Sequence, residues 1–342
     1  MTEHDLKNLF STLIGFTFHR VTGGALHVAS GLLLLFCFAA FGQSDNPPLP
    51  APHSESAFVG PPQASAHAQH PPASNTLTYW YGTRYRTPFV LTPRTGSAAN
   101  IHRNSIEFAH SSFWALGNNF ADVMVSQSNM AEPASNGGTG ATEIYFILRS
   151  ALGFNEMSDT QAFRKGPMRD LAVEFGTNLE TKNSSYAPAE RTLYIGPRVD
   201  FAVPRGYLHV GFHFRQEWNH QGVLGRSEDY SPNFNIEPSW MFPINAGKLH
   251  LAWNGFAEYN TPKGRDSFGS ETVSEFLLRN TVAADIGSLL FGRAQLLDLN
   301  AGLWYWHNEY GKPVSDPGAE QVTPMIGMTI HLDGGRSTRG KR

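Results

Sequence analysis

The stretch RGYLHVGFHFRQEW, from Arg205 to Trp218, alternates between apolar and polar side chains at every second position. The apolar positions are Leu208, Val210, Phe212 and Phe214, and the polar positions include His209, His213, Arg215 and Glu217. Successive side chains of a β-strand point to opposite faces of the sheet. The stretch therefore predicts a strand with one apolar face and one face of imidazole, guanidinium and carboxylate groups.

Segments of the same kind, each about ten residues long, continue through residues 76–332. The predicted strands are 77–89, 104–114, 119–128, 142–153, 170–180, 191–203, 205–218, 233–243, 248–259, 273–284, 294–306 and 322–332. Their number is about twelve, and closed bacterial barrels have an even number of strands.

The predicted connections alternate in length. Short turns fall near 116–118, 204–206 and 244–247, and longer polar loops fall at 90–102, 129–141, 219–232, 260–272 and 306–321, with intermediate loops at 154–169 and 181–190. Short turns at one end and long loops at the other are typical of outer-membrane barrels. The connection 284–293, ADIGSLLFGR, fits poorly because it is apolar for a turn.

Composition favours a membrane barrel over a soluble β-sandwich. Charged residues are 16% of the 342-residue chain, below the roughly 25% of ordinary globular proteins. The polar face of the strands carries Arg, Glu, Asp, His, Tyr and Trp with little Lys, which suits a narrow hydrated lumen. The net charge of −3 gives no sign of a nucleic-acid partner. We therefore expect an all-β protein, a closed antiparallel up-and-down transmembrane β-barrel.

The N-terminal region resembles an export signal. Residues 28–42, VASGLLLLFCFAAFG, form the only long apolar run, with Lys7 and Arg20 before it and small residues at its end. This pattern predicts a signal peptide over 1–42. The alternative is a single transmembrane anchor, although the run is shorter than the roughly twenty residues that a spanning helix needs. Cleavage there removes Cys37, the only cysteine.

The remaining divisions follow from composition. Residues 43–75 are rich in Pro, Ala, Ser and His and predict a disordered linker, whose His53, His67 and His70 are either solvated or weak metal ligands. Residues 76–333 form the predicted barrel, and residues 334–342 form a basic C-terminal tail.

Several strands also resemble those of a known family. YWYGTRYRTPF (79–89), NNFADVMVSQSN (118–129) and TEIYFILRSALG (142–153) are similar to strands of the nucleoside-specific channel-forming (Tsx-like) outer-membrane proteins. HFRQEWNHQG (213–222) and EPSWMFPI (237–244) are similar more weakly. The resemblance implies a monomeric barrel of twelve strands that passes nucleosides across the bacterial outer membrane by diffusion. The Pro-rich linker and the end DGGRSTRGKR depart from the family pattern.

Strand alternation predicts which side chains face the lumen, and no cofactor or resident metal is expected. The predicted lumenal residues are Arg84, Arg86, Glu107, Asp122, Glu143, Tyr145, Arg149, Glu174, Arg198, Asp200, His213, Arg215, Glu217, Glu258, Arg279, Asp298 and Trp304. Charged members contact solute or pair with one another to hold the wall together. Tyr145 and Trp304 are candidates for stacking on a nucleoside base, or for packing against a lumenal loop.

Three other interpretations remain open from the sequence. His209 and His213 share a strand face and either chelate a metal or form lumenal hydrogen bonds. A lipid-hydrolysing barrel needs a Ser–His pair, for which HSS (110–112) and WHNEY (306–310) are the places to look, although no catalytic motif is present. A structural barrel with partner-binding loops is the third possibility.

Overall fold

The computed structural model describes residues 73–247, 249–333 and 336–337. The predicted signal peptide, nearly all of the Pro-rich linker and most of the basic tail lie outside these residues. In the part of the chain that is described, no helix has the length and apolar character needed to cross a membrane.

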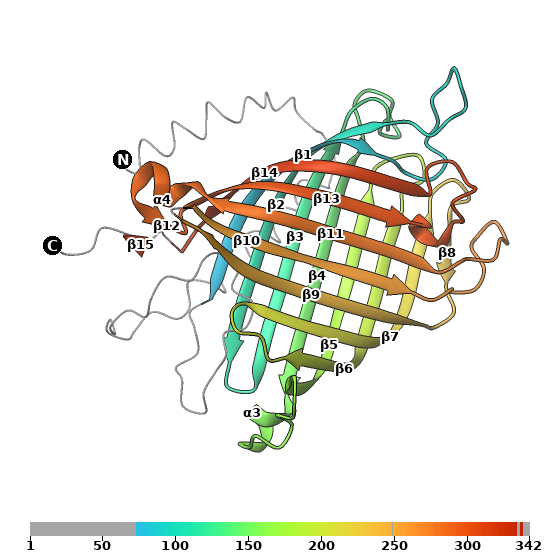
Figure 1. Ribbon diagram of the computed structural model, residues 1–342. Helices are drawn as coiled ribbons and strands as arrows, with labels where there is room; N and C mark the ends of the chain where they lie inside the picture. Colours follow the sequence, from blue (N-terminus) through green and yellow to red (C-terminus); the bar gives the residue numbers. More distant parts are fainter. Residues whose placement is uncertain (1–72, 248, 334–335, 338–342) are drawn as a thin grey trace. The chain divides into compact units, whose positions relative to one another are not determined.

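Twelve long antiparallel strands form the wall of the protein (Figure 1). They are β1 (Ser74–Tyr85), β2 (Ile101–Trp114), β3 (Gly117–Ser128), β4 (Thr142–Gly153), β5 (Met168–Lys182), β6 (Ala189–Phe201), β7 (Tyr207–Gln221), β9 (Asn233–Ala246), β10 (Leu249–Asn260), β11 (Glu275–Asp285), β13 (Leu297–His307) and β14 (Glu320–His331). The bounds of each wall strand agree with those of a predicted strand to within a few residues. The predicted fold class is therefore confirmed.

The wall closes because the first and last strands pair with each other. β1 and β14 run antiparallel from Thr76 opposite His331 to Gly82 opposite Met325. β6 and β7 also pair, which joins the remaining edges of the sheet. Closure leaves no wall strand with an open edge, so every strand finds hydrogen-bond partners within the same chain.

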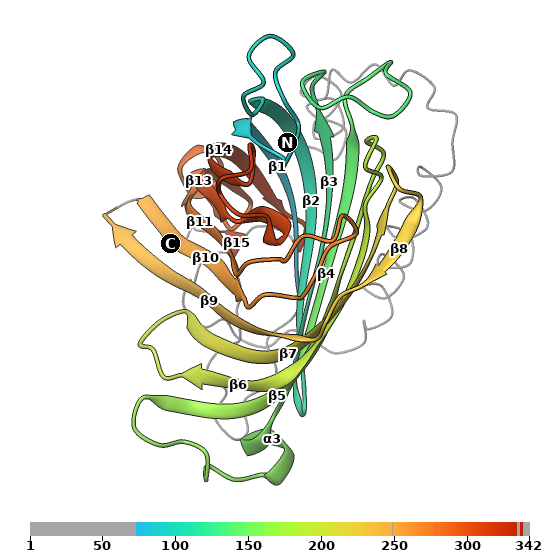
Figure 2. The same ribbon diagram turned by 90° about the vertical axis from the view of Figure 1, so that its right-hand side faces the viewer.

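Connections alternate between the two ends of the barrel as the sequence predicts. β2–β3, β6–β7 and β9–β10 are joined by short turns, and the long loops lie at the opposite end, which faces the viewer in Figure 2. The short-turn end also carries the helices α3 (Phe154–Ser158) and α4 (Ile286–Phe291). α4 accounts for the apolar connection that fitted a turn poorly: the Asp285 side chain accepts a hydrogen bond from the Ser288 amide and begins the helix.

Three short strands lie outside the wall. β8 (Arg226–Asp229) pairs only with the end of β7 and extends a loop hairpin. β12 (Arg293–Ala294) pairs with β15 (Arg336–Ser337), so part of the segment predicted as a basic tail is hydrogen-bonded beside α4.

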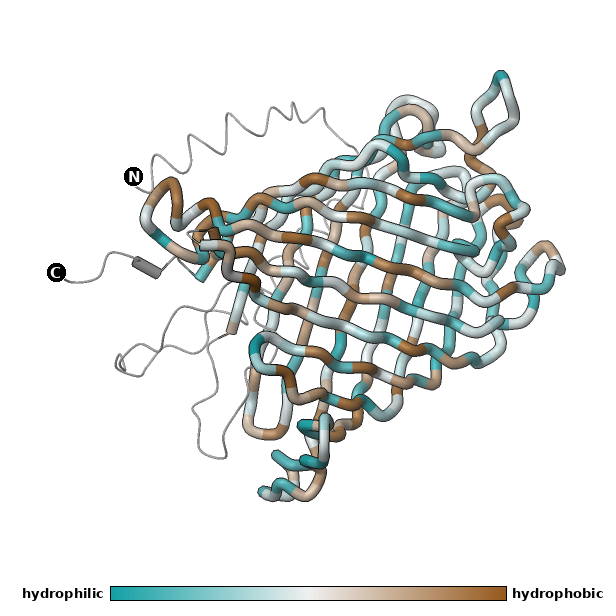
Figure 3. The backbone as a smooth tube through the Cα atoms, viewed as in Figure 1, coloured by the Kyte–Doolittle hydropathy of each residue, from teal (hydrophilic) through white to brown (hydrophobic). Residues whose placement is uncertain are grey.

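The opening stretch forms β7 with the predicted division of faces. Phe212 and Phe214 are 45% and 47% exposed, whereas His213 and Arg215 are 1% and 4% exposed. The same parity holds along the other wall strands, and Figure 3 shows hydrophobic and hydrophilic positions alternating along them. A closed sheet with an apolar outer wall and a charged interior is the architecture of transmembrane β-barrels of the bacterial outer membrane.

One predicted lumenal residue is on the wrong face. Arg84 is exposed, and Tyr85 is buried in the interior instead. The register of β1 against β2 shifts between Gly82 and Tyr85, which marks a β-bulge. A bulge inserts one extra residue and reverses the parity of the positions that follow it. The prediction for Arg84 assumed unbroken alternation and was wrong for that reason.

Candidate functional site

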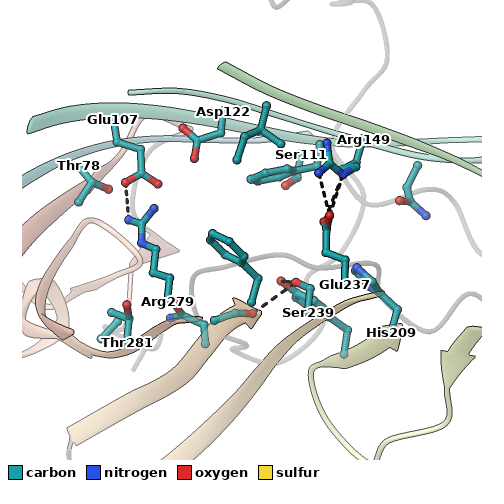
Figure 4. Close-up of a pocket in the computed structure, with 18 of the residues that line it drawn as sticks. Thr78, Glu107, Ser111, Asp122, Arg149, His209, Glu237, Ser239, Arg279 and Thr281 are labelled. Atoms are coloured by element: carbon teal, nitrogen blue, oxygen red, sulfur yellow. Dashed lines mark hydrogen bonds and ion pairs between the residues drawn. The ribbon is translucent and has the colours of Figure 1, made fainter. Parts of the chain in front are cut away.

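A cavity lies in the middle of the lumen (Figure 4). It contains about 1270 Å³ of empty space, part of which is open to solvent. Its walls come from strands on both sides of the barrel, because lumenal side chains of all twelve strands converge there.

One end of this central cavity is crossed by an ion pair between Arg149 on β4 and Glu237 on β9. Arg149 donates to Glu237 from Nε at 3.2 Å and from Nη2 at 2.7 Å. Arg149 also donates from Nη1 to Asn178 Oδ1 at 2.8 Å, and its guanidinium lies 4.2 Å from the centre of the Tyr194 ring. These contacts use the planar donor geometry of arginine and fix its position in the lumen.

A second ion pair crosses the lumen between Arg279 on β11 and Glu107 on β2. The Trp80 indole also donates to Glu107 Oε2 at 2.7 Å. The Arg279 guanidinium lies 5.0 Å from the Trp80 ring and 5.9 Å from the Trp304 ring. We call the Arg149–Glu237 and Arg279–Glu107 pairs the two cross-lumen struts, because neighbouring strands in the wall supply neither pair.

Between the struts, Asp122 projects from β3 into the cavity (Figure 4). It is 7% exposed, and its Oδ1 is buried without a hydrogen-bond partner among the described residues. Glu258 and Phe256 on β10 line the same cavity, together with Phe120 on β3. The space between the struts is therefore lined by carboxyl groups and by aromatic rings.

Toward the short turns, the lumen contains a network centred on Arg198 and Glu174. Arg198 Nη1 donates to Glu174 Oε2 at 2.6 Å, and Nη2 donates to Asp200 Oδ2 at 3.2 Å. The other Glu174 oxygen lies 3.1 Å from His213 Nε2. Gly211 leaves room for the imidazole ring, since a Cβ atom there would lie 2.3 Å from His213 Cε1. This network holds neighbouring strands together.

Toward the long loops, two further clusters fill the interior. In one, Glu132 of the loop after β3 accepts from Arg103 at 3.0 Å and from Lys182 at 3.1 Å. Burial alone would raise the pKa of Glu132, but these two cations hold the pKa well below its usual range. In the other, Arg215 and Lys263 both donate to Glu217, at 2.7 Å and 2.6 Å.

The loop between β13 and β14 enters this half of the lumen. Its short helix η1 (Glu309–Gly311) places the Tyr310 hydroxyl 3.2 Å from Glu180 Oε1 on β5, across the barrel. Tyr310 has a φ of +59°, a left-handed conformation that is rare for a non-glycine residue. Strained conformations of this kind persist where surrounding contacts enforce them, often at functional positions.

Glu309, the residue before Tyr310, is buried among charged groups of the wall. It accepts from Gln321 Nε2 on β14 at 3.0 Å. Burial raises the pKa of Glu309 well above its usual range, and Glu143 and Glu180 raise it further, against the opposing effect of Arg103 and Lys182. Glu309 therefore keeps its proton to higher pH than an exposed glutamate.

Most of the predicted lumenal residues line either the central cavity or smaller cavities toward the long loops. Central-cavity residues are Asp122, Arg149, Arg198, Glu258 and Arg279, with Glu107, Glu174 and Asp298. Glu143, Tyr145, Arg215 and Trp304 line smaller cavities toward the long loops. His213 and Glu217 are buried in ion pairs and line none of these cavities. The lumenal placement of all of these agrees with strand alternation, and their roles toward a solute stay predictions.

Sequence reasoning missed several cavity residues. Glu237, which completes a strut, was not assigned to the lumen, although residues 233, 235, 237 and 239 alternate as polar positions along β9. Trp80 and Phe256 were missed because aromatic side chains at lumenal positions look like those of an outer wall. The partner of each charge across the barrel has no signal in the sequence at all.

The candidate hydrolase positions are separated or already bonded to other groups. His110 Nδ1 lies 2.8 Å from Asn75 Oδ1 on the outer face, whereas Ser111 faces the cavity. His307 lies 3.4 Å from Glu320 and 3.4 Å from the Tyr305 hydroxyl. Neither histidine is hydrogen-bonded to a serine in the described residues. Nor do these residues contain a cluster of three or more His, Cys, Asp or Glu arranged to hold a metal.

Comparisons with known proteins add only distant likenesses. No family model matches the chain, and no curated protein sequence matches it. Among solved structures, the chain is similar to the NanC porin at 10% identity and a TM-score of 0.41, with 75% of this chain and 100% of that chain covered. The KdgM porin is similar at 9% identity and a TM-score of 0.34, over 75% of this chain and 98% of that chain.

The translocator domain of the autotransporter NalP from Neisseria meningitidis is similar at 14% identity and a TM-score of 0.36, over 75% of this chain and 86% of that chain. At such TM-scores the fold rests on the strand pairing of this chain itself, and the likenesses carry no functional argument.

Proposed function

We propose that the chain is an outer-membrane channel for passive diffusion of small polar solutes, with nucleosides as preferred solutes. The observation that carries the proposal is the central cavity, which is lined by charged and aromatic side chains inside a barrel closed by β1 and β14. Because the wall needs no second chain to close, a monomer is the proposed functional unit.

The chemistry of the cavity suits a solute with a flat ring and hydroxyl groups. Phe120 and Phe256 offer aromatic faces, and Ser239, Asn254 and Glu258 offer polar groups nearby. Stacking of a base on an aromatic ring contributes about 1–3 kcal/mol. A hydrogen bond to a charged group contributes about 1.5–3 kcal/mol. A few such contacts bind a nucleoside weakly enough for it to leave again, which passage through a channel requires.

The proposed driving force is the solute gradient alone. The two struts fix the distance between opposite walls, so the cavity between them keeps its size without a bound ligand. Tyr310 narrows the path on the loop side, where its hydroxyl meets Glu180. Passage past this point then sets the size limit for solutes.

The proposal is tested by conductance of the purified protein in planar lipid bilayers. We expect discrete channels whose current is reduced by adenosine or cytidine at millimolar concentration. Liposome swelling across nucleosides, sugars and amino acids then ranks the solutes. Absence of any conductance, with a correctly folded barrel on gels, would contradict the channel itself. Equal swelling rates for all solutes of one size would contradict only the nucleoside preference.

Two single variants separate solute contacts from structure. Asp122→Ala removes the carboxyl group between the struts, and Tyr145→Ala removes a ring from the loop-side cavity, where its hydroxyl accepts from Asn178 at 2.9 Å. We expect weaker nucleoside block in both variants with unchanged folding. Unchanged block in both would exclude these residues from the solute path.

A further inference from the structure

Helix α4 ends in three exposed apolar side chains at the short-turn end of the barrel. Leu289, Leu290 and Phe291 are 52%, 66% and 46% exposed, and we call them the apolar tip. Figure 1 shows α4 beyond the ends of the wall strands, and Figure 3 shows hydrophobic positions in this part of the chain. Adjacent exposed apolar side chains point to contact with a partner or a membrane, whereas single ones need no explanation.

The first turn of α4 is fixed to the barrel. Gly287 is buried, and a Cβ atom there would lie 2.8 Å from the backbone nitrogen of Leu297 at the start of β13. The Asp285 side chain accepts from the amide of Ser288 at 3.0 Å and from the amide of Gln295 at 3.3 Å, which ties the two ends of the connection together. The fold therefore sets the position of the apolar tip at the end of the wall.

Strand length places the apolar tip at the level of a membrane surface. β11 leads directly into α4 and has 11 residues, and its outward positions from Phe276 to Ala284 are apolar except for Asn280. At about 3.4 Å per residue and a tilt of about 40°, a strand of this length rises roughly 26 Å along the barrel axis. The apolar band of an outer-membrane barrel is about 25 Å tall. α4 therefore begins where the hydrocarbon layer ends.

The lipid-facing wall continues toward the helix. Leu299 on β13 is 53% exposed, and Leu332, directly after β14, is 52% exposed. The carbonyl of Leu296, between α4 and β13, accepts from the amide of His331 at 3.2 Å, which joins this connection to the end of β14. The apolar tip thus lies at the edge of a surface that already faces lipid.

The size of the apolar tip favours lipid over a protein partner. A stable protein interface buries about 800 Å² on each partner, more than three partly exposed side chains supply. The last carbonyl groups of a helix have no partners within the helix. The headgroup boundary, where water is available, therefore suits the end of α4 better than the hydrocarbon core.

We propose that α4 is a membrane-surface anchor, whose apolar tip enters the boundary between headgroups and acyl chains in the leaflet at the short-turn end. In outer-membrane barrels that end is the periplasmic one. The partner is the phospholipid itself: the apolar tip contacts the upper acyl chains, and the end of the helix stays in contact with water and headgroups. The inference depends on the barrel lying in a membrane and not on what passes through its lumen.

Fluorescence quenching by labelled lipids tests the anchor. Leu290→Cys is made in a Cys37→Ser background, because Cys37 is the only cysteine of the chain, and an environment-sensitive fluorophore is attached. The full chain is folded into phosphatidylcholine vesicles whose lipids carry a nitroxide either near the headgroup or near the end of the acyl chain. We expect a blue-shifted emission and quenching that is stronger for the nitroxide near the headgroup.

Met157→Cys and Leu299→Cys, in the same background, are the matched controls. Met157 lies on α3 at the same end of the barrel and is 42% exposed, but its neighbours Glu156 and Ser158 are exposed and polar, so we expect little quenching there. Leu299 faces lipid on the wall, so we expect strong quenching there. Leu289→Cys gives a second, independent position on the apolar tip.

Heat-dependent migration on gels identifies folded barrels, and the outcomes are read from these. Quenching in Leu289→Cys and Leu290→Cys that is no stronger than in Met157→Cys overturns the proposal. Stronger quenching by the deep nitroxide also overturns it, because that result places the apolar tip in the hydrocarbon core. Emission that stays blue-shifted when the protein is diluted in lipid supports the anchor, whereas emission that shifts to the red on dilution identifies a second copy as the occupant and overturns it.

Discussion

The Arg149–Glu237 strut makes a quantitative prediction about stability. Arg149→Met keeps most of the side-chain volume and removes the charge and all donors, so no large cavity is created. Glu237 then loses three hydrogen bonds to Arg149, and Glu258 loses its ion pair with Arg149 at 3.9 Å. The side chains of the pair are 7% and 11% exposed, so water replaces little of what is lost.

Removal of one partner from a buried ion pair costs about 3–5 kcal/mol. Replacement of both partners by apolar residues of similar volume is often neutral, because no charge stays buried alone. We therefore expect Arg149→Met to lower the free energy of unfolding by about 3–5 kcal/mol, and the double variant with Glu237→Met to recover most of that loss. The assay is urea unfolding in lipid vesicles, followed by tryptophan fluorescence and by the heat-dependent shift of the folded band on gels.

Arg84→Met is the matched control for this experiment. Arg84 is exposed on the outside of the bulge in β1, so the same chemical change there is expected to alter stability by no more than about 0.5 kcal/mol. An Arg149→Met variant as stable as the full chain would refute the strut. A double variant whose loss equals the sum of two separate losses would refute the idea that an uncompensated charge is the cause.

Three further predictions concern the path of the solute. Tyr310→Ala removes the contact across the lumen to Glu180, so single-channel conductance in bilayers should rise, and a conductance equal to that of the full chain would exclude this narrowing. Burial raises the folded pKa of Glu309, so the stability that its proton gives to the folded loop is lost as pH rises through that folded pKa, because the unfolded loop releases the proton at lower pH. Protease cutting of the 308–319 loop should therefore increase as pH rises above the range in which exposed glutamates titrate, and Glu309→Gln should abolish the increase. Phe256→Ala should weaken nucleoside block by about fivefold or more in current measurements, as expected for a lost stacking contact, whereas Phe212→Ala on the outer wall should leave the block unchanged.

Strand alternation was sufficient to predict most of the fold. Phe214 outside and Arg215 inside follow from the two-residue period of β7 alone, and the same period places Asp122 and Arg279 correctly. Arg84 is a position at which strand alternation predicts the wrong face. A bulge changes parity through backbone geometry, and the flanking residues Gly82–Tyr85 carry no pattern that distinguishes a bulge from a regular strand.

The prediction for the apolar connection before β13 failed for a different reason. Exposed Leu289, Leu290 and Phe291 are unusual in a turn, and the sequence alone gave them no place in an alternating strand. In the structure they belong to α4, begun by the Asp285 side chain. A helix of this length is too short for its period to be visible in the sequence.

Partner choice across the lumen decides which charges are structural and which are available to a solute. Alternation places Arg149 and Asp122 alike inside the barrel, and nothing in either strand says that Arg149 forms an ion pair with Glu237, whereas Asp122 forms none within 4.0 Å among the described residues. That distinction depends on the diameter and register of the closed wall, which bring β4 opposite β9 and leave β3 facing open space. A paired charge offers a passing solute little net attraction, whereas an unpaired one must be satisfied by whatever enters. Closure of the wall therefore decides which lumenal charges meet across the barrel, and strand alternation alone does not.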